Sequence, residues 1–266
     1  MINRFYIFFI VTILLFSSCQ KVIDVEVNDT EEKLVIEAIY NASDEQVTVK
    51  LTKSIDVFGP VEFPTVSGAI IEIAGPNGST EILEEVQEGV YVLNNYSPIF
   101  NSDYKMIVNV EGESYESTTY LPEVVPLDSL TARFEEASLF GGEGYVIFMH
   151  FKDPPGSNFY RATRIVNGNE LTRLSQQFIF DDTFSEGNVQ AVPFFSSRYN
   201  IDDTITVNLK SYSEASYDYY IGLFEIVGDG GQSAAPANPP SNWSNNALGH
   251  FAAWGYDSKT IVVEED

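Results

Sequence analysis

The sequence predicts a mainly β protein, in which an antiparallel β-sandwich is followed by a second β-rich domain with one helix. Short segments of alternating apolar and polar residues recur along the chain, and Gly, Pro and Asn turn signals separate them at close intervals. The chain has 266 residues, enough to bury one large or two small cores. Hydrophobic residues make up 44% of it and aromatic residues 14%, which indicates a globular protein.

The first 18 residues differ from the rest and predict a signal peptide. Arg4 is the only charged residue before Cys19, and Phe5–Phe16 is a continuous apolar run that is too short to span a bilayer comfortably. Two small residues, Ser17 and Ser18, then lead into Cys19, the only cysteine of the chain. A single cysteine excludes an internal disulfide.

This order of residues resembles the lipobox of bacterial lipoproteins, although Phe16 stands where that motif usually has leucine. The resemblance implies that the chain is cleaved before Cys19, that the sulfur of Cys19 is diacylated, and that its new amino group is acylated. Two or three acyl chains give stable anchoring to a membrane, which one chain does not. The alternatives are an ordinary signal peptide and an N-terminal helix whose cysteine is incidental.

The charge of the chain excludes some partners. Asp and Glu number 39 and Lys and Arg 14, so that the formal net charge is -25 and the pI is near 4.2. Such a surface repels nucleic acid and anionic headgroups, so we expect neither as a partner. Removal of residues 1–18 takes away only Arg4 and leaves a net charge of -26. The negative field favours cations or basic partners, and the alternative is that it serves solubility alone.

We expect residues 19–33 to be an acidic tether and residues 34–121 to be the β-sandwich domain. Within the sandwich, Val47, Val49 and Leu51 alternate with polar residues, as in a half-buried strand. Similar segments follow as far as the "YESTTYLP" sequence that ends at Pro122. The sequence therefore predicts six or seven short strands in this domain.

Residues 122–130 are predicted to be a linker, marked by Pro122 and Pro126, and residues 131–266 a β-rich domain. One helix is predicted near residues 213–227, where aromatic and aliphatic residues recur at helical spacing.

The boundaries of this helix are also marked in the sequence. Ser211 and Glu214 stand in the order of a capping box. The "GDGG" sequence after residue 227 is a strong stop signal.

The sequence holds little that suggests catalysis. His150 and His250 are its only histidines, and we expect both to be structural residues of strands. No G-x-S-x-G, H-E-x-x-H, Walker or dinucleotide-binding motif is present. Carboxylates are too abundant for any pair to be singled out as the acid and base of a hydrolase. We therefore expect no enzymatic activity and no cofactor.

An acidic segment provides the weak candidates for a calcium site, which are Asp181, Asp182 and Glu186. Their spacing does not match an EF-hand, and acidic loops are common in so acidic a chain. We expect no metal site.

Aromatic residues are the candidates for ligand binding. Tyr217 and Tyr220 lie on the predicted helix, Trp243 lies in a Pro- and Asn-rich loop, and Trp254 follows soon after. Tyr and Trp suit recognition surfaces because they combine a large contact area with a polar group. Packing in a core is the alternative for all four. Trp243 is the strongest candidate because polar residues flank it.

The chain as a whole resembles a family of outer-membrane lipoproteins from the Bacteroidota that contain a domain of unknown function. The matching segments, in order, are Cys19, "LVIEAIY", "VSGAIIEI", "EGVY", "YKMIVNVEGESYESTTYLP", "FKDPPGSNFYRA", "FDDTF", "YDYY" and "NPPSNWSNNALGHFAAW". The first half is also similar to the immunoglobulin, transthyretin and carboxypeptidase-regulatory types of β-sandwich.

Members of this family are typically encoded beside TonB-dependent receptors. The resemblance thus implies a lipid anchor in the outer membrane, with the surface or periplasmic face left open. It also implies an accessory or ligand-capturing role for such a receptor in nutrient uptake. A structural or adhesive surface lipoprotein is the alternative, and a surface hydrolase is the third possibility.

Overall fold

The computed structural model describes residues 32–55, 62–137, 142–183, 187–227 and 238–265. The strands of the first half are β1 (Leu34–Asn41), β2 (Gln46–Lys53), β3 (Ile70–Ala74), β4 (Thr80–Ile82), β5 (Glu84–Gln87), β6 (Val90–Asn94), β7 (Ser102–Val110) and β8 (Glu113–Leu121). Those of the second half are β9 (Leu127–Glu135), β10 (Gly144–Lys152), β11 (Phe159–Val166), β12 (Asn169–Glu170), β13 (Phe178–Asp181), β14 (Val189–Pro193), β15 (Thr204–Tyr212) and β16 (Leu248–Val262). A 3-10 helix η1 (Leu174–Gln176) and the α-helix α2 (Glu214–Val227) complete the described elements.

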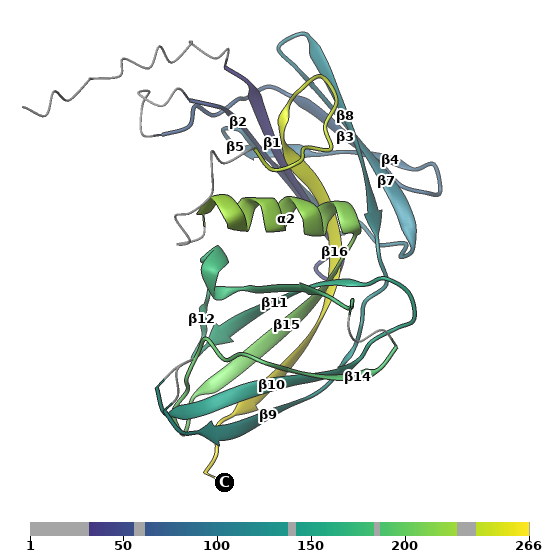
Figure 1. The fold of residues 1–266 in the computed structure, drawn as a ribbon. Coiled ribbons are helices and arrows are strands. Elements are labelled where there is room, and N and C mark those ends of the chain that lie inside the picture. The colour runs from purple at the N-terminus through teal and green to yellow at the C-terminus, as the bar shows by residue number, and fades with distance from the viewer. Residues whose placement is uncertain (1–31, 56–61, 138–141, 184–186, 228–237, 266) are drawn as a thin grey trace, which may run out of the picture. The chain divides into compact units, whose positions relative to one another are not determined.

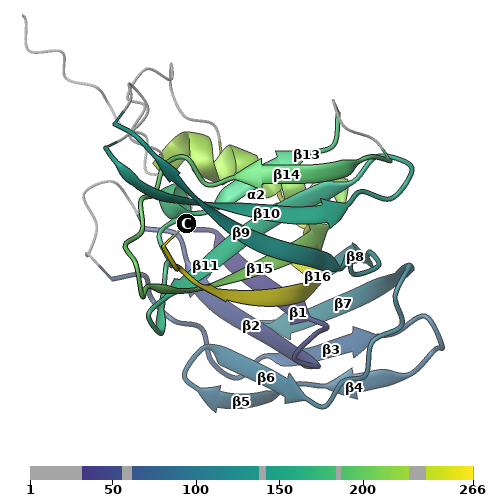
Figure 2. The ribbon, with the colours of Figure 1, turned by 90° about the horizontal axis from the view of Figure 1, so that it is seen from below.

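One large sheet underlies both halves of the described chain. Its order is β12-β11-β15-β16-β1-β2-β6-β5, and β13 also pairs with β11. A four-stranded sheet, β4-β3-β7-β8, packs on its β1 and β2 end, and a three-stranded sheet, β14-β10-β9, packs on its β11 and β15 end (Figures 1 and 2). The result is two sandwiches that share a sheet, each with its own hydrophobic core.

The alternation read from the sequence sets the inner faces of these sandwiches. Val47, Val49 and Leu51 of β2 are fully buried in the first core. Ile205, Val207 and Leu209 of β15 are fully buried in the second core. Side chains of a strand alternate between faces, so the intervening residues point to the opposite face of the shared sheet. The prediction of a mainly β protein with antiparallel sheets and one α-helix is confirmed for the described residues.

Strand β16 joins the two sandwiches. Its first part pairs in parallel with β1, from Val35↔Leu248 to Asn41↔Trp254. Its second part pairs antiparallel with β15, from Ser211↔Gly255 to Thr204↔Val262. In Figure 1 it runs past α2 from one sandwich into the other. The structure thus differs from a division into 34–121 and 131–266, because residues after 247 contribute to the first core as well as to the second core.

The close pairing of β16 with β1 depends on Gly249. Its φ of 91° is in the left-handed region. A Cβ atom at this position would collide with the carbonyl group of Ile36 on β1. Glycine is therefore required here both for its backbone conformation and for the approach of the two strands.

The predicted linker and helix cap also differ in detail. Strand β9 begins at Leu127, inside the expected linker 122–130, and the Leu127 amide donates to the Asp257 carboxylate at 2.7 Å. The hydroxyl of Ser213, not that of Ser211, accepts the Ser216 amide at the start of α2. Ser211 instead accepts the Val125 amide at 3.2 Å, because the strand β15 still includes it. Among the described residues, none of the helices is long and apolar enough to span a membrane.

Candidate functional site

Trp243, the strongest aromatic candidate in the sequence, lies in the first core. Its exposed fraction is 6%, and its indole Nε1 donates to the Ile36 carbonyl at 3.0 Å. Its ring stacks on Phe251 with 6.3 Å between centroids. The expectation that Trp243 binds a ligand through an exposed ring is therefore corrected: the polar neighbours of Trp243 face outward while its ring faces in.

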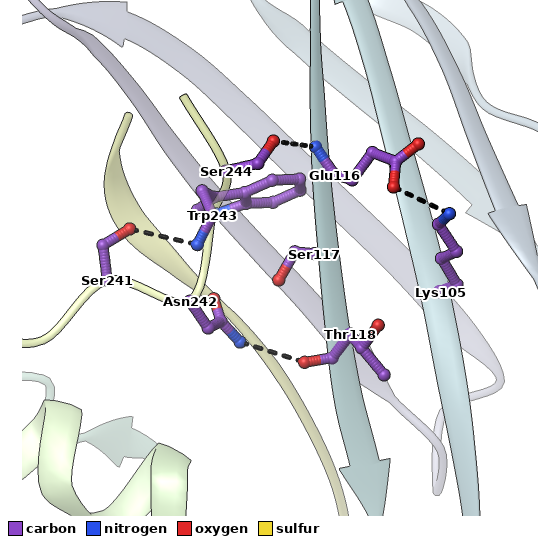
Figure 3. Close-up of a pocket in the computed structure, with 8 residues that line it drawn as sticks. All are labelled: Lys105, Glu116, Ser117, Thr118, Ser241, Asn242, Trp243 and Ser244. Carbon is purple, nitrogen blue, oxygen red and sulfur yellow. Dashed lines mark hydrogen bonds and ion pairs between the residues drawn. The ribbon is translucent and has the colours of Figure 1, made fainter. Parts of the chain in front are cut away.

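The polar neighbours of Trp243 attach their loop to β8. The Ser244 hydroxyl accepts the Glu116 amide at 2.8 Å, and the Asn242 amide group donates to the Thr118 carbonyl at 3.3 Å. Figure 3 shows these bonds around a shallow pocket with the Lys105–Glu116 ion pair at its rim. Most of the polar groups that line this pocket form hydrogen bonds or ion pairs within the protein. We therefore regard the loop as a structural segment that is bonded to β8.

A second group of residues gathers on the outer face of the shared sheet, beside α2. Arg161 of β11 and Lys210 of β15 are register partners in an antiparallel pair. Directly opposite residues point to the same face with their Cβ atoms about 5 Å apart. Since Leu209 points into the second core, Lys210 and Arg161 point to the side where α2 lies (Figure 1). We call these residues, together with Tyr212, Tyr220 and Trp254, the aromatic–cationic cluster.

Aromatic rings surround both cations of this cluster. The Arg161 guanidinium lies 4.4 Å from the centroid of the Tyr220 ring, and the Lys210 Nζ lies 5.1 Å from that of Trp254. Tyr212 stacks on Tyr220 with 5.3 Å between centroids and lies equally far from Trp254. Such cation–π contacts hold a charged group where water is scarce.

The hydrogen bonds of the two cations are unequal. Arg161 donates through Nε to Gln177 Oε1 at 2.5 Å and through Nη1 to the Tyr212 hydroxyl at 2.8 Å. Lys210 forms no hydrogen bond and no ion pair with any described residue. Burial, and secondarily the charge of Arg161, lowers the pKa of Lys210 to about 8. Asp44 and Glu170 act on Lys210 only through space.

Two buried polar atoms beneath α2 also lack partners among the described residues. They are the indole Nε1 of Trp254, a residue that is only 5% exposed, and the Nδ1 of His250. The other ring nitrogen of His250 lies 3.2 Å from the Ser216 hydroxyl of α2, and its ring stacks on Tyr219. Burial lowers the pKa of His250 to about 4, so this ring is neutral at pH 7.

The remaining candidates fall elsewhere. Tyr217 packs on Phe159, with ring centroids 5.0 Å apart, and its hydroxyl donates to Asp181 at 3.4 Å. Asp182 is buried and accepts the Asn158 amide at 2.9 Å. Among the described residues no cluster of three or more His, Cys, Asp or Glu is suited to a metal ion. Cys19 and Glu186 lie outside the described residues.

The structure thus brings together two of the four aromatic candidates, Tyr220 and Trp254, whereas Tyr217 packs on Phe159 and Trp243 lies in the first core. Sequence analysis did not single out Arg161, Lys210 or Tyr212. One signal was available in the sequence. The alternation of β15 places Lys210 on the face of the sheet opposite to that of the buried Leu209, and the chain has few cations.

The architecture defines the protein as a double β-sandwich with one shared sheet and an aromatic–cationic cluster on the outer face of that sheet. The chain belongs to the family described as "Domain of unknown function (DUF4249)", which matches residues 20–260. No curated protein matches the chain at a significant level.

Two solved structures show some similarity. The chicken CNTN1 FN1-FN3 domains are 10% identical, with a TM-score of 0.28, over 66% of this chain and 59% of that one. The chicken interferon gamma receptor alpha chain is 10% identical, with a TM-score of 0.23, over 87% of this chain and 97% of that one.

Proposed function

We propose that this protein is a lipid-anchored, non-enzymatic binding protein of the outer membrane that captures a ligand for a TonB-dependent receptor in nutrient uptake. The observation that carries the proposal is the position of Cys19. The only thiol of the chain follows a short apolar run and two serines, and the family match begins at the next residue. This arrangement suits a lipid anchor that precedes a folded domain.

The physical argument for the anchor is energetic. Each acyl methylene buried in a bilayer contributes about 0.8 kcal/mol, so two or three chains hold a protein at the membrane. Residues 20–31, which are rich in acidic side chains, then separate the anchor from the first strand at Leu34. The resemblance to lipoproteins encoded beside TonB-dependent receptors supports the proposed partner, and the aromatic–cationic cluster supports ligand capture.

Fractionation of cells tests the anchor. A Cys19→Ser chain should leave the membrane fraction and lose incorporation of labelled fatty acid, while its β-sandwiches still fold, as circular dichroism would show. A Ser17→Ala chain keeps a small residue before the cysteine and should remain lipidated. A Cys19→Ser chain that stays membrane-bound would contradict the proposal.

Co-purification tests the partner. Extraction of the native lipoprotein in mild detergent should recover a TonB-dependent receptor in a defined ratio, and deletion of the gene should impair growth on one nutrient. Recovery without any receptor, or growth that is unaffected on every nutrient tested, would support a structural or adhesive role instead.

A further inference from the structure

We propose that the aromatic–cationic cluster binds the carboxylate group of an organic ligand, with Lys210 and Arg161 as the groups that hold it. This inference deepens the proposed function, on which it rests for the purpose of capture, by naming the chemical class of the ligand. It starts from Lys210, a cation without a hydrogen-bond or ion-pair partner among the described residues.

The surplus polar groups of the cluster are donors. Lys210 offers three N–H groups, and Arg161 offers those it does not spend on Gln177 and Tyr212. The indole of Trp254 lies beside the Lys210 ammonium, is only 5% exposed, and has no acceptor for its N–H among the described residues, so its N–H signal reports on changes next to Lys210. Arg161 and Lys210 are the donors of the cluster that solvent reaches, so the arrangement favours a ligand that supplies acceptors to them. An anionic oxygen group does this best.

A comparison with Arg164, a buried arginine of the same strand, supports a special role for Arg161 and Lys210. Arg164 lies on the opposite, inner face of β11 and donates to three neutral acceptors: the Ser197 hydroxyl, the Tyr199 hydroxyl and the Gln176 carbonyl. Both terminal nitrogens of that guanidinium are bonded within the protein, and only its Nε has no partner among the described residues. Lys210 has no comparable set of acceptors within the described part of the chain, although it is only partly exposed to solvent.

The charge and the surroundings of the cluster favour a singly charged organic ion. The net charge of -25 repels each negative charge of an approaching ligand, so a monoanion is repelled less than phosphate or sulfate. The rings of Tyr220 and Trp254 provide a flat apolar boundary beside the cations. Arg161 and Lys210 are partly exposed, so a carboxylate reaches them from solvent.

The two tryptophans of the chain provide a built-in control for the test. In a ¹H–¹⁵N spectrum of the full lipidated chain in detergent, each indole N–H gives one signal. The indole of Trp243 is already bonded to the Ile36 carbonyl in the first core, whereas that of Trp254 has no acceptor among the residues that the structure describes. A Trp243→Phe chain assigns the two signals.

Sodium benzoate is the probe, with sodium chloride and sodium sulfate added at equal ionic strength. We expect benzoate to move the Trp254 signal in a saturable way and to leave the Trp243 signal in place, and we expect chloride and sulfate to have little effect. A Lys210→Met chain should bind benzoate about tenfold more weakly or worse, the loss typical of one charge-assisted hydrogen bond. A Lys50→Met chain loses the same charge at an exposed site of β2 and should bind within about twofold of the native chain.

The outcomes separate the inference from the proposed function. An unmoved Trp254 signal, equal movement with sulfate, or unchanged affinity in Lys210→Met would each overturn the carboxylate site. Co-purification with the receptor does not depend on any of these results. If the receptor co-purifies but the Trp254 signal does not respond to benzoate, the proposed function stands and only the carboxylate site is overturned. If the Trp254 signal responds but no receptor co-purifies, the carboxylate site stands and the proposed receptor partner is overturned.

Discussion

Arg161 and Lys210 lie opposite each other on β11 and β15, and neither forms an ion pair with a described carboxylate. The ion pairs that the described residues do form, Lys53–Glu111 and Lys105–Glu116 among them, lie at the surface, where such pairs contribute little. A chain with 39 acidic residues thus leaves these two neighbouring, partly buried cations without an ion-pair partner in the part of the chain that the structure describes. This arrangement costs stability, and the cost can be measured.

The first prediction concerns the charge of Lys210. Its pKa is lowered from 10.5 to about 8, so the folded state binds this proton less tightly than the unfolded state does. The loss of stability builds up as the pH falls from 10.5 to 8 and is complete below pH 8. Lys210→Met should therefore raise the free energy of unfolding at pH 7 by about 2 kcal/mol, allowing for partial exposure.

Urea denaturation at pH 7 and pH 10 measures this effect. The gain from Lys210→Met should shrink at pH 10, where the native lysine loses its proton on folding. Lys50→Met, at an exposed position, should change the stability by less than about 0.5 kcal/mol at both pH values. A Lys210→Met chain that is less stable at pH 7 would mean that the lysine supports the fold.

The second prediction concerns His250. Burial lowers its pKa from 6.5 to about 4, so only the unfolded state gains a proton between these values. The stability that a neutral His250 provides is present above pH 6.5 and is lost as the pH falls toward 4, by about 3 kcal/mol. His250→Gln should remove this part of the acid sensitivity.

The measurement is the difference in unfolding free energy between native and His250→Gln chains from pH 7.5 to pH 4, which cancels the titration of the carboxylates. His150→Gln, which removes the other histidine, should keep the acid sensitivity of the native chain. Parallel pH profiles for the native and His250→Gln chains would contradict the buried neutral ring.

The third prediction concerns Gly249. Both Gly249 and Gly168 have positive φ values, of 91° and 79°, but only at Gly249 would a Cβ atom meet the backbone of Ile36. Alanine should cost about 1–2 kcal/mol at Gly168 from the backbone alone. At Gly249 it should cost about 1–3 kcal/mol more, because β16 must move away from β1. Equal losses in thermal or urea unfolding would show that the strands are not so close.

The fourth prediction concerns Trp243. Because its ring is part of the first core, Trp243→Ala should destabilise the protein by about 3–5 kcal/mol, and Trp243→Phe should cost less because most of the volume is kept. Phe63→Ala removes an aromatic ring that is 58% exposed and should cost far less. A Trp243→Ala chain of native stability would restore Trp243 as a surface residue.

Local structure could be predicted well from the sequence, whereas contacts between distant parts of the chain could not. The alternation of Val47, Val49 and Leu51 predicted a strand and its buried face, because both follow from neighbouring residues. The parallel pairing of β16 with β1 joins residues more than 200 positions apart, and no local pattern encodes it. The prediction that Trp243 binds a ligand is wrong for a related reason: the loop that holds Trp243 is bonded to β8, a strand distant in the sequence.

The candidate site was predictable only in part. Tyr220 and Trp254 could be named from their residue types, and the helix that carries Tyr220 followed from its periodicity. Arg161 could not be paired with Lys210, because their position opposite each other depends on the register of β11 against β15. Register is set by the packing of whole strands and by the turns between them, which a single sequence does not reveal.

Mass spectrometry of the N-terminal peptide of the native, membrane-extracted protein tests the central proposal most directly. A lipid-anchored binding protein predicts a peptide that begins at Cys19 and has the added mass of two or three acyl chains. A peptide that begins at Met1, or at any residue other than Cys19, with the thiol of Cys19 unmodified or absent, would contradict it.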